Sequence, residues 1–266
     1  GGEEKDSHRG VAMVAGFIMT MISYFFVLTY GGMVMQAVME EKANRIVELI
    51  VSSVKPFQLM LGKTAGILLV GLFQLLIWAL LLAVIMPIAD KLCGVNIAMM
   101  SANGSTAAVS DAGLSDAMIM WLSVMNLPYL EMGIMFLLLF IGGYLLYASV
   151  FAAIGASINE QQDSSQFMMP IMLLMAFSLY AAIYSVENTD GPLAFWASIF
   201  PLSSPIVMMV RIPFGVPLWQ EILSVALLYL TALLGIWGSG RIYRVGILMY
   251  GKKPTYKELW KWLKMK

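Results

Sequence analysis

Cysteine and histidine are almost absent from this sequence, which has one of each, Cys93 and His8, among 266 residues. A lone cysteine cannot form a disulfide within the chain, and zinc sites and Cys–His catalytic pairs need more of these residues than are present. Charged residues make up only 12%, and 16 Lys and Arg balance 16 Asp and Glu. Without a basic excess the chain has no electrostatic attraction for nucleic acid. These absences argue against zinc chemistry, Cys–His catalysis and nucleic-acid binding.

Hydrophobic residues, in contrast, make up 60% of the chain, whereas about 45 to 50% is usual in soluble domains. A helix of about 20 apolar residues crosses the roughly 30 Å hydrocarbon core of a membrane. Charge-free stretches of that length predict five spans. The predicted spans cover about 11–39, 64–88, 132–158, 165–186 and 219–240. We therefore predict an all-α fold, a polytopic membrane helix bundle that forms a single transmembrane domain over residues 1–266.

A sixth apolar stretch, 191–217, is rich in proline and is predicted to form short broken helices that enter one face of the membrane and leave by the same face. Its candidate outer-gate residues are Pro201, Ser203, Ser204, Pro205 and Arg211. Two carboxylates, Glu131 and Glu221, lie at the outer ends of the third and fifth predicted spans. They are candidates for an ion exit path, although charges at span ends are ordinary and the interfacial interpretation is the stronger one.

Lys and Arg are distributed unevenly between the two sides of this predicted bundle. Segments 40–63 and 241–266 together hold twelve basic residues, and the opposite side holds four. Because cytoplasmic loops carry the excess of Lys and Arg, this distribution predicts an outer N-terminus and a cytoplasmic C-terminus.

Segment 40–56, between the first two predicted spans, has the pattern of an amphipathic helix. Glu41 and Arg45 are four residues apart, and an apolar stripe recurs at the same spacing. Lys55-Pro56 is predicted to end this helix, because the residue before proline disfavours the helical conformation. From periodicity alone, an ordinary interfacial connector and a docking element are equally supported.

The C-terminal segment 255–266 also predicts an amphipathic helix, with Thr255 and Glu258 at capping-box spacing. Lysines form its polar side, and we expect it to lie in the cytoplasmic headgroup region with Trp260 and Trp262 as anchors.

Four stretches of this sequence resemble one family of membrane proteins, the permeases of type 2 ATP-binding-cassette exporters, and particularly their sodium-efflux branch. The stretches are EEKANRIVELIVSSVKPFQLMLGK (40–63) after GGMVMQAV (31–38), NEQQDSSQ (159–166), FPLSSPIVMMVRIPFG (200–215) and RIYRVGILMYGKKPTYKEL (241–259). The resemblance covers nearly the whole chain from about Gly10. Members of the branch begin with a further membrane helix and a large outer domain, so the chain is expected to be the C-terminal part of a longer protein.

The resemblance implies that segment 40–56 is a coupling helix seated in a groove of a separate ATP-binding subunit. The residues it assigns to coupling are Glu40, Glu41, Arg45, Glu48, Ser52, Ser53, Lys55 and Pro56. It further implies a bacterial inner-membrane protein that pairs with a second permease chain and contacts lipid. ATP and Mg²⁺ would be bound by the partner subunit, with no cofactor and no catalysis in this chain.

The residues themselves agree that no ATPase site is present. Gly62-Lys63-Thr64 matches the end of a phosphate-binding loop, but Phe57 stands where that motif needs a glycine. Two other functions, an ion-coupled secondary transporter and a membrane-embedded enzyme, would require different residue patterns. An ion-coupled secondary transporter should place ionisable residues near the middle of the spans, and a membrane-embedded enzyme should show a nucleophile with its base. The sequence shows neither pattern, and it leaves the transported ion or small molecule unidentified.

Overall fold

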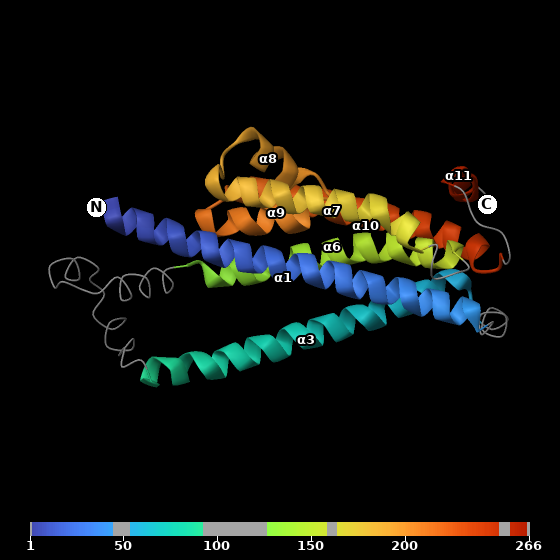
Figure 1. Cartoon of the computed structure of the whole chain (residues 1–266), viewed down its shortest axis with the longest axis horizontal. Coiled ribbons are helices and arrows are strands. Elements are labelled where there is room, and N and C mark those ends of the chain that lie inside the picture. Colours follow the sequence, from blue (N-terminus) through green and yellow to red (C-terminus); the bar gives the residue numbers. More distant parts are fainter. Residues whose placement is uncertain (1, 45–53, 93–126, 159–163, 250–255, 265–266) are drawn as a thin grey trace. The chain divides into compact units, whose positions relative to one another are not determined.

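The computed structural model describes residues 2–44, 54–92, 127–158, 164–249 and 256–264, and within these ranges every regular element is helical (Figure 1). The helices are α1 (Gly2–Ala43), α3 (Pro56–Leu92), α6 (Tyr129–Ser157), α7 (Ser164–Glu187), α8 (Pro192–Ile199), α9 (Ser204–Arg211), the 3₁₀ turn η3 (Ile212–Phe214), α10 (Leu218–Gly246) and α11 (Tyr256–Lys264). Five of them, α1, α3, α6, α7 and α10, are long and apolar enough to cross a membrane. The predicted all-α fold with five spans is confirmed.

Next to segment 40–56, two helix boundaries differ from the prediction. Helix α1 continues through Ala43, so Glu40 and Glu41 form its last turn instead of starting a separate helix. Glu, Lys and Ala are good helix formers, and no glycine or proline interrupts them here. Helix α3 begins at Pro56, eight residues before the predicted start. Proline is favoured in the first turn of a helix, where its missing N–H costs nothing.

The chain divides into two compact units. The first comprises Gly1–Val11 and Leu69–Leu127, and the second Ala12–Leu68 and Pro128–Lys266. Within the described residues, the first unit therefore contains the beginning of α1 and the later part of α3. The second contains the remainder of both helices and all of α6 to α11, together with every residue of the sites described below.

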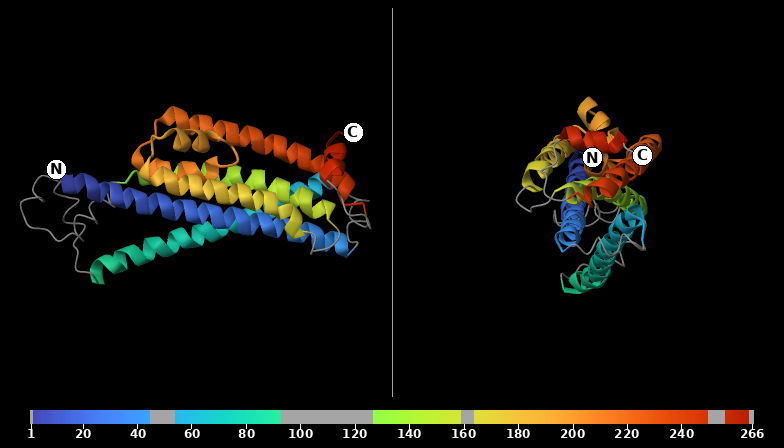
Figure 2. Two further views of the ribbon diagram at one scale, coloured as in Figure 1. Left: turned by 45° about the horizontal axis from the view of Figure 1, so that its top comes forward. Right: turned by 90° about the vertical axis from the view of Figure 1, so that its right-hand side faces the viewer.

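Helix α6 is the core of the second unit. In its most apolar window 61% of the residues are buried, compared with 22% in α7 and in α10. Figures 1 and 2 show α6 (green) lying between α1 (blue) and α10 (orange to red). Backbones approach closely at its end: a Cβ on Gly155 would lie 2.7 Å from the Met35 carbonyl oxygen, and one on Gly246 would lie 3.0 Å from that of Ala156. Small residues thus let three helix ends converge.

Helices α8 and α9 form a hairpin, which confirms the short broken helices predicted from the prolines. Its turn reaches the middle of α6, because Tyr147 Oη donates a hydrogen bond of 2.5 Å to the Leu202 carbonyl oxygen. Helix α1 holds the other side of the hairpin: Thr20 Oγ1 donates to the Ile206 carbonyl oxygen at 3.1 Å, and Ser23 Oγ to that of Pro205 at 3.0 Å. Side-chain hydroxyls from α6 and α1 therefore bond the carbonyl of the hairpin turn and two carbonyls in the first turn of α9.

Candidate functional site

Lys42, in the last turn of α1, joins the ends of three helices. Its side chain is 2% exposed. Its Nζ donates hydrogen bonds to the carbonyl oxygens of Ala156, at the end of α6, at 2.7 Å, and of Gly246, at the end of α10, at 2.8 Å. Carbonyls in the last turn of a helix lack an intrahelical partner, and the helix dipole favours a cation there. One ammonium group thus stabilises two helix ends at once.

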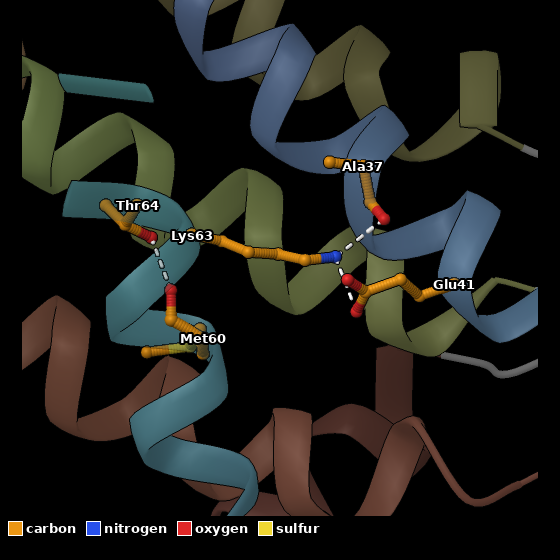
Figure 3. A network of polar contacts seen from close by, with 5 residues as sticks. All are labelled: Ala37, Glu41, Met60, Lys63 and Thr64. Atoms are coloured by element: carbon orange, nitrogen blue, oxygen red, sulfur yellow. Dashed lines mark hydrogen bonds and ion pairs between the residues drawn. The ribbon is translucent and has the colours of Figure 1, made fainter. Parts of the chain in front are cut away.

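The residue before Lys42 connects α1 to α3. Glu41 Oε2 lies 2.6 Å from Nζ of Lys63, which also donates to the Ala37 carbonyl oxygen at 2.7 Å. In Figure 3 the Lys63 side chain extends from α3 to α1, where Ala37 and Glu41 lie one turn apart. Both side chains of the ion pair are mostly buried. We call Glu41, Lys42 and Lys63, with the three carbonyls they bond, the helix-end junction.

A second contact ties α3 to α6 one residue further along. Tyr144 Oη donates to the Thr64 carbonyl oxygen at 2.9 Å, while Thr64 Oγ1 donates to the Met60 carbonyl oxygen at 2.9 Å. Lys63 and Thr64 therefore both have partners within the chain. The residues that resemble the end of a phosphate-binding loop serve here to pack helices.

The residues predicted to couple to an ATPase are placed as follows. Glu40 is exposed, Glu41 belongs to the helix-end junction, Lys55 is exposed and Pro56 opens α3. Arg45, Glu48, Ser52 and Ser53 lie outside the described residues. Lys42 and Lys63 were not among the predicted site residues, because the sequence does not show which helices their side chains contact. The one available signal was their position beside long charge-free runs, since Lys42 follows Glu40 and Glu41 after the first run and Lys63 directly precedes the second.

Arg211, the last residue of α9, holds the hairpin together from inside. It is buried, and its Nε donates to the Thr189 carbonyl oxygen at 2.8 Å while Nη1 donates to Ser198 Oγ at 2.6 Å. Ser224 of α10 adds a bond of 2.7 Å to the Ser198 carbonyl oxygen. Burial lowers the pKa of the Arg211 guanidinium, and the Asp190 carboxylate opposes this shift.

The other predicted gate residues of the hairpin form its turn. Ser203 Oγ donates to the Ala197 carbonyl oxygen at 2.6 Å, and Ser204 Oγ to that of Pro201 at 3.4 Å. Pro205 follows within the first turn of α9. These bonds give the residues a structural role in the hairpin, and a gating role remains a prediction.

Glu221, in the first turn of α10, differs from an ordinary interfacial charge. It is 1% exposed, and neither of its carboxylate oxygens has a hydrogen-bond partner among the described residues. Glu131, in the first turn of α6, lies close enough for the two charges to repel each other. Helix α8 packs on α10 beside this site through Phe195 and Trp219, whose ring centroids are 6.1 Å apart. Sequence position alone could not show that a neighbouring helix buries Glu221.

The C-terminal helix α11 contacts α10. Arg241 places its guanidinium carbon 4.0 Å from the centre of the Trp237 ring, and its Nη1 donates to the Leu263 carbonyl oxygen at 3.0 Å. Trp262 is buried, whereas Trp260 is exposed. Trp262 packs inside the protein and so does not anchor the helix in the headgroup region, whereas the anchoring role of the exposed Trp260 stays a prediction.

Comparisons with known proteins agree with this architecture. A family model described as ABC-2 family transporter protein matches residues 7–241. The uncharacterized protein YhaP of Bacillus subtilis is 27% identical over 263 residues, which cover 97% of this chain and 57% of YhaP. An uncharacterized protein of Methanocaldococcus jannaschii is 24% identical over 260 residues, covering 97% of this chain and 55% of the relative. The chain thus spans a little over half the length of both relatives. No solved structure shows a significant match.

Proposed function

The chain belongs to the ABC-2 family of transporter membrane proteins, and from this premise we propose that it is the permease part of an ATP-driven exporter. A separate ATP-binding cassette subunit hydrolyses ATP with Mg²⁺, and a second permease chain completes the pathway. In this proposal the protein lies in a bacterial inner membrane with its C-terminus in the cytoplasm. The solute moved outward is an ion or a small molecule.

The helix-end junction is the observation that carries this proposal. The connection between α1 and α3 leaves the junction after Lys42 and returns to it at Lys63. The ion pair of Glu41 with Lys63 ties both ends of that connection together. A force applied to residues 44–55 therefore acts on α1 and α3 as one body.

The same junction passes displacement further into the bundle. Lys42 is hydrogen-bonded to the ends of α6 and α10, so a shift of the last turn of α1 pulls on both helices. Packed helices of this kind move as rigid bodies instead of bending, because interiors are dense. In the proposed cycle, ATP-driven closure of the partner displaces segment 40–56, and the junction converts that displacement into tilting of four spans.

The test uses the full-length protein purified with its ATP-binding subunit. In wild type we expect co-purification and ATP-dependent efflux from vesicles. Arg45→Glu should reduce solute-stimulated ATP hydrolysis at least tenfold, since it reverses a charge that the resemblance places against the partner. Arg244→Glu makes the same charge change at an exposed position on the last turn of α10 and serves as the control.

Two outcomes would contradict the proposal. Efflux driven by an ion gradient in vesicles without ATP would favour an ion-coupled secondary transporter. Equal coupling in wild type and Arg45→Glu would remove the assigned role of segment 40–56.

A further inference from the structure

The beginning of α10 contains a buried carboxylate that the proposed transport cycle does not use. Glu221 lies on the same face of α10 as Ser224 and Leu228, and all three are buried. Its two oxygens accept no hydrogen bond from any described residue. A buried ionised carboxylate without a partner costs several kcal/mol, so chains rarely keep one.

Glu131, in the first turn of α6, lies at the same end of the α6–α10 pair as this carboxylate. Helices α6 and α10 run parallel: Tyr229 Oη donates to the Leu138 carbonyl oxygen at 3.1 Å, and further along a Cβ on Gly246 would meet Ala156. This register places the first turns of both helices at one level. The two carboxylates accordingly interact electrostatically, with like sign.

The remaining groups near Glu221 do not neutralise it. Helix α8 has no charged residue, and Arg211 of α9 directs its Nε and Nη1 to Thr189 and Ser198. Next to Glu221, the side-chain oxygen of Gln220 is also buried without a partner. Three buried oxygen atoms, two of Glu221 and one of Gln220, thus lie in the first turn of α10 without a hydrogen-bond partner among the described residues, at the same end of the pair as the Glu131 carboxylate.

We propose that Glu221 and Glu131, helped by Gln220, bind one divalent cation of the calcium class at this end of the α6–α10 pair. Oxygen is the preferred ligand of hard cations, and calcium accepts carboxylate and amide oxygens in flexible geometry, with water or backbone carbonyls completing its shell. A charge of +2 balances both carboxylates, which a single monovalent ion does not. The ion links the first turns of α6 and α10, and this function is independent of the exporter proposal.

The experiment measures the Tm of the full-length protein in detergent after EDTA treatment, with and without added CaCl₂. In wild type we expect calcium to raise the Tm by about 3 °C or more, because a ligand that binds only the folded state stabilises it. Glu221→Gln should abolish this rise, and Glu131→Gln should lower the apparent calcium affinity at least tenfold. Glu187→Gln changes a carboxylate at the end of α7 instead and should leave the rise unchanged.

Several results would overturn the proposal. One is an equal calcium response in Glu221→Gln, and another is an equal rise produced by NaCl or KCl at matched ionic strength. The absence of any calcium response in wild type would show that Glu221 is simply kept uncharged. If Glu221→Gln does not fold, the Glu131→Gln titration decides, and an unchanged calcium affinity there would also refute the site.

Discussion

Each end of the α6–α10 pair contains a fully buried charged residue, Lys42 at one end and Glu221 at the other, and their surroundings differ. At one end the ammonium of Lys42 is 2% exposed and donates to two carbonyl oxygens. At the other end the carboxylate of Glu221 is 1% exposed and receives no hydrogen bond from a described residue. The two side chains are therefore buried to the same extent, but only Lys42 has hydrogen-bond partners among the described residues. Where the chain supplies partners itself, a buried charge fixes helix ends; where it supplies none, the site is prepared for a group from outside.

The difference has a simple geometric origin. Helix C-termini present free carbonyls, and carbonyls from two helices can bond one lysine when small residues let the backbones approach. Helix N-termini present N–H groups, but neither carboxylate oxygen of Glu221 accepts a hydrogen bond from a described residue, and Glu131, in the first turn of α6, adds a second negative charge at this end.

Removing Lys42, the buried charge that has hydrogen-bond partners, should produce the largest change in stability. Lys42→Met deletes two charge-assisted hydrogen bonds and the cation at two helix ends, and we expect a loss of about 2 kcal/mol in unfolding free energy. The fall in Tm in detergent measures it. Lys55→Met, at an exposed position, is the control. A Lys42→Met protein as stable as wild type would show that the junction does not hold the helices.

Removing the charge of Glu221, which has no hydrogen-bond partner among the described residues, should raise the stability instead of lowering it. In EDTA, Glu221→Gln replaces an unpaired buried carboxylate by a neutral group of the same shape, and we expect a gain of about 1 kcal/mol. The Tm of wild type and variant without divalent cations makes the comparison. A loss of stability in EDTA would mean that Glu221 has a partner, and the contrast between the two ends would fail.

The ion pair beside Lys42 should contribute less, because part of each side chain reaches solvent. We expect a coupling energy of about 0.5 kcal/mol between Glu41 and Lys63. Tm values of Glu41→Gln, Lys63→Met and the double variant form the thermodynamic cycle. Strict additivity would show that the 2.6 Å contact contributes packing without pairing energy.

The smallest change in stability is expected at Glu40, one residue before Glu41. Glu40 is exposed on the last turn of α1, so Glu40→Gln should alter the unfolding free energy by less than about 0.5 kcal/mol. Its Tm, compared with that of Glu41→Gln, separates an exposed from a paired carboxylate on the same helix. A large effect at Glu40 would reveal a contact beyond those described.

Hydropathy and proline positions were sufficient to predict the five spans and the α8–α9 hairpin, since both depend on local chain properties. They could not predict that α1 continues to Ala43 or that α3 starts at Pro56, because helix formers between two spans fit either helix. Glu41 was identified as a site residue through the family resemblance. Lys42 was not, because its role depends on which helices end beside it.

The burial of Glu221 could not be predicted from the sequence either. Its place at a span end suggests exposure to water or headgroups, and the hairpin that packs beside it comes from residues ten or more positions earlier. Trp262 shows the same limit: the amphipathic pattern of the last helix could be recognised in the sequence, but which of its two tryptophans is buried could not.

Lys42 bonds main-chain oxygens, and this has a consequence for how the contact would persist through evolution. A carbonyl is present whatever side chain the residue carries, so positions 156 and 246 have no complementary side chain to exchange with the lysine. We expect related sequences to record this contact as a constant lysine opposite small residues, and not as positions that change together. Searches for co-varying pairs would pass over it, although it joins helix ends separated by 114 and 204 residues.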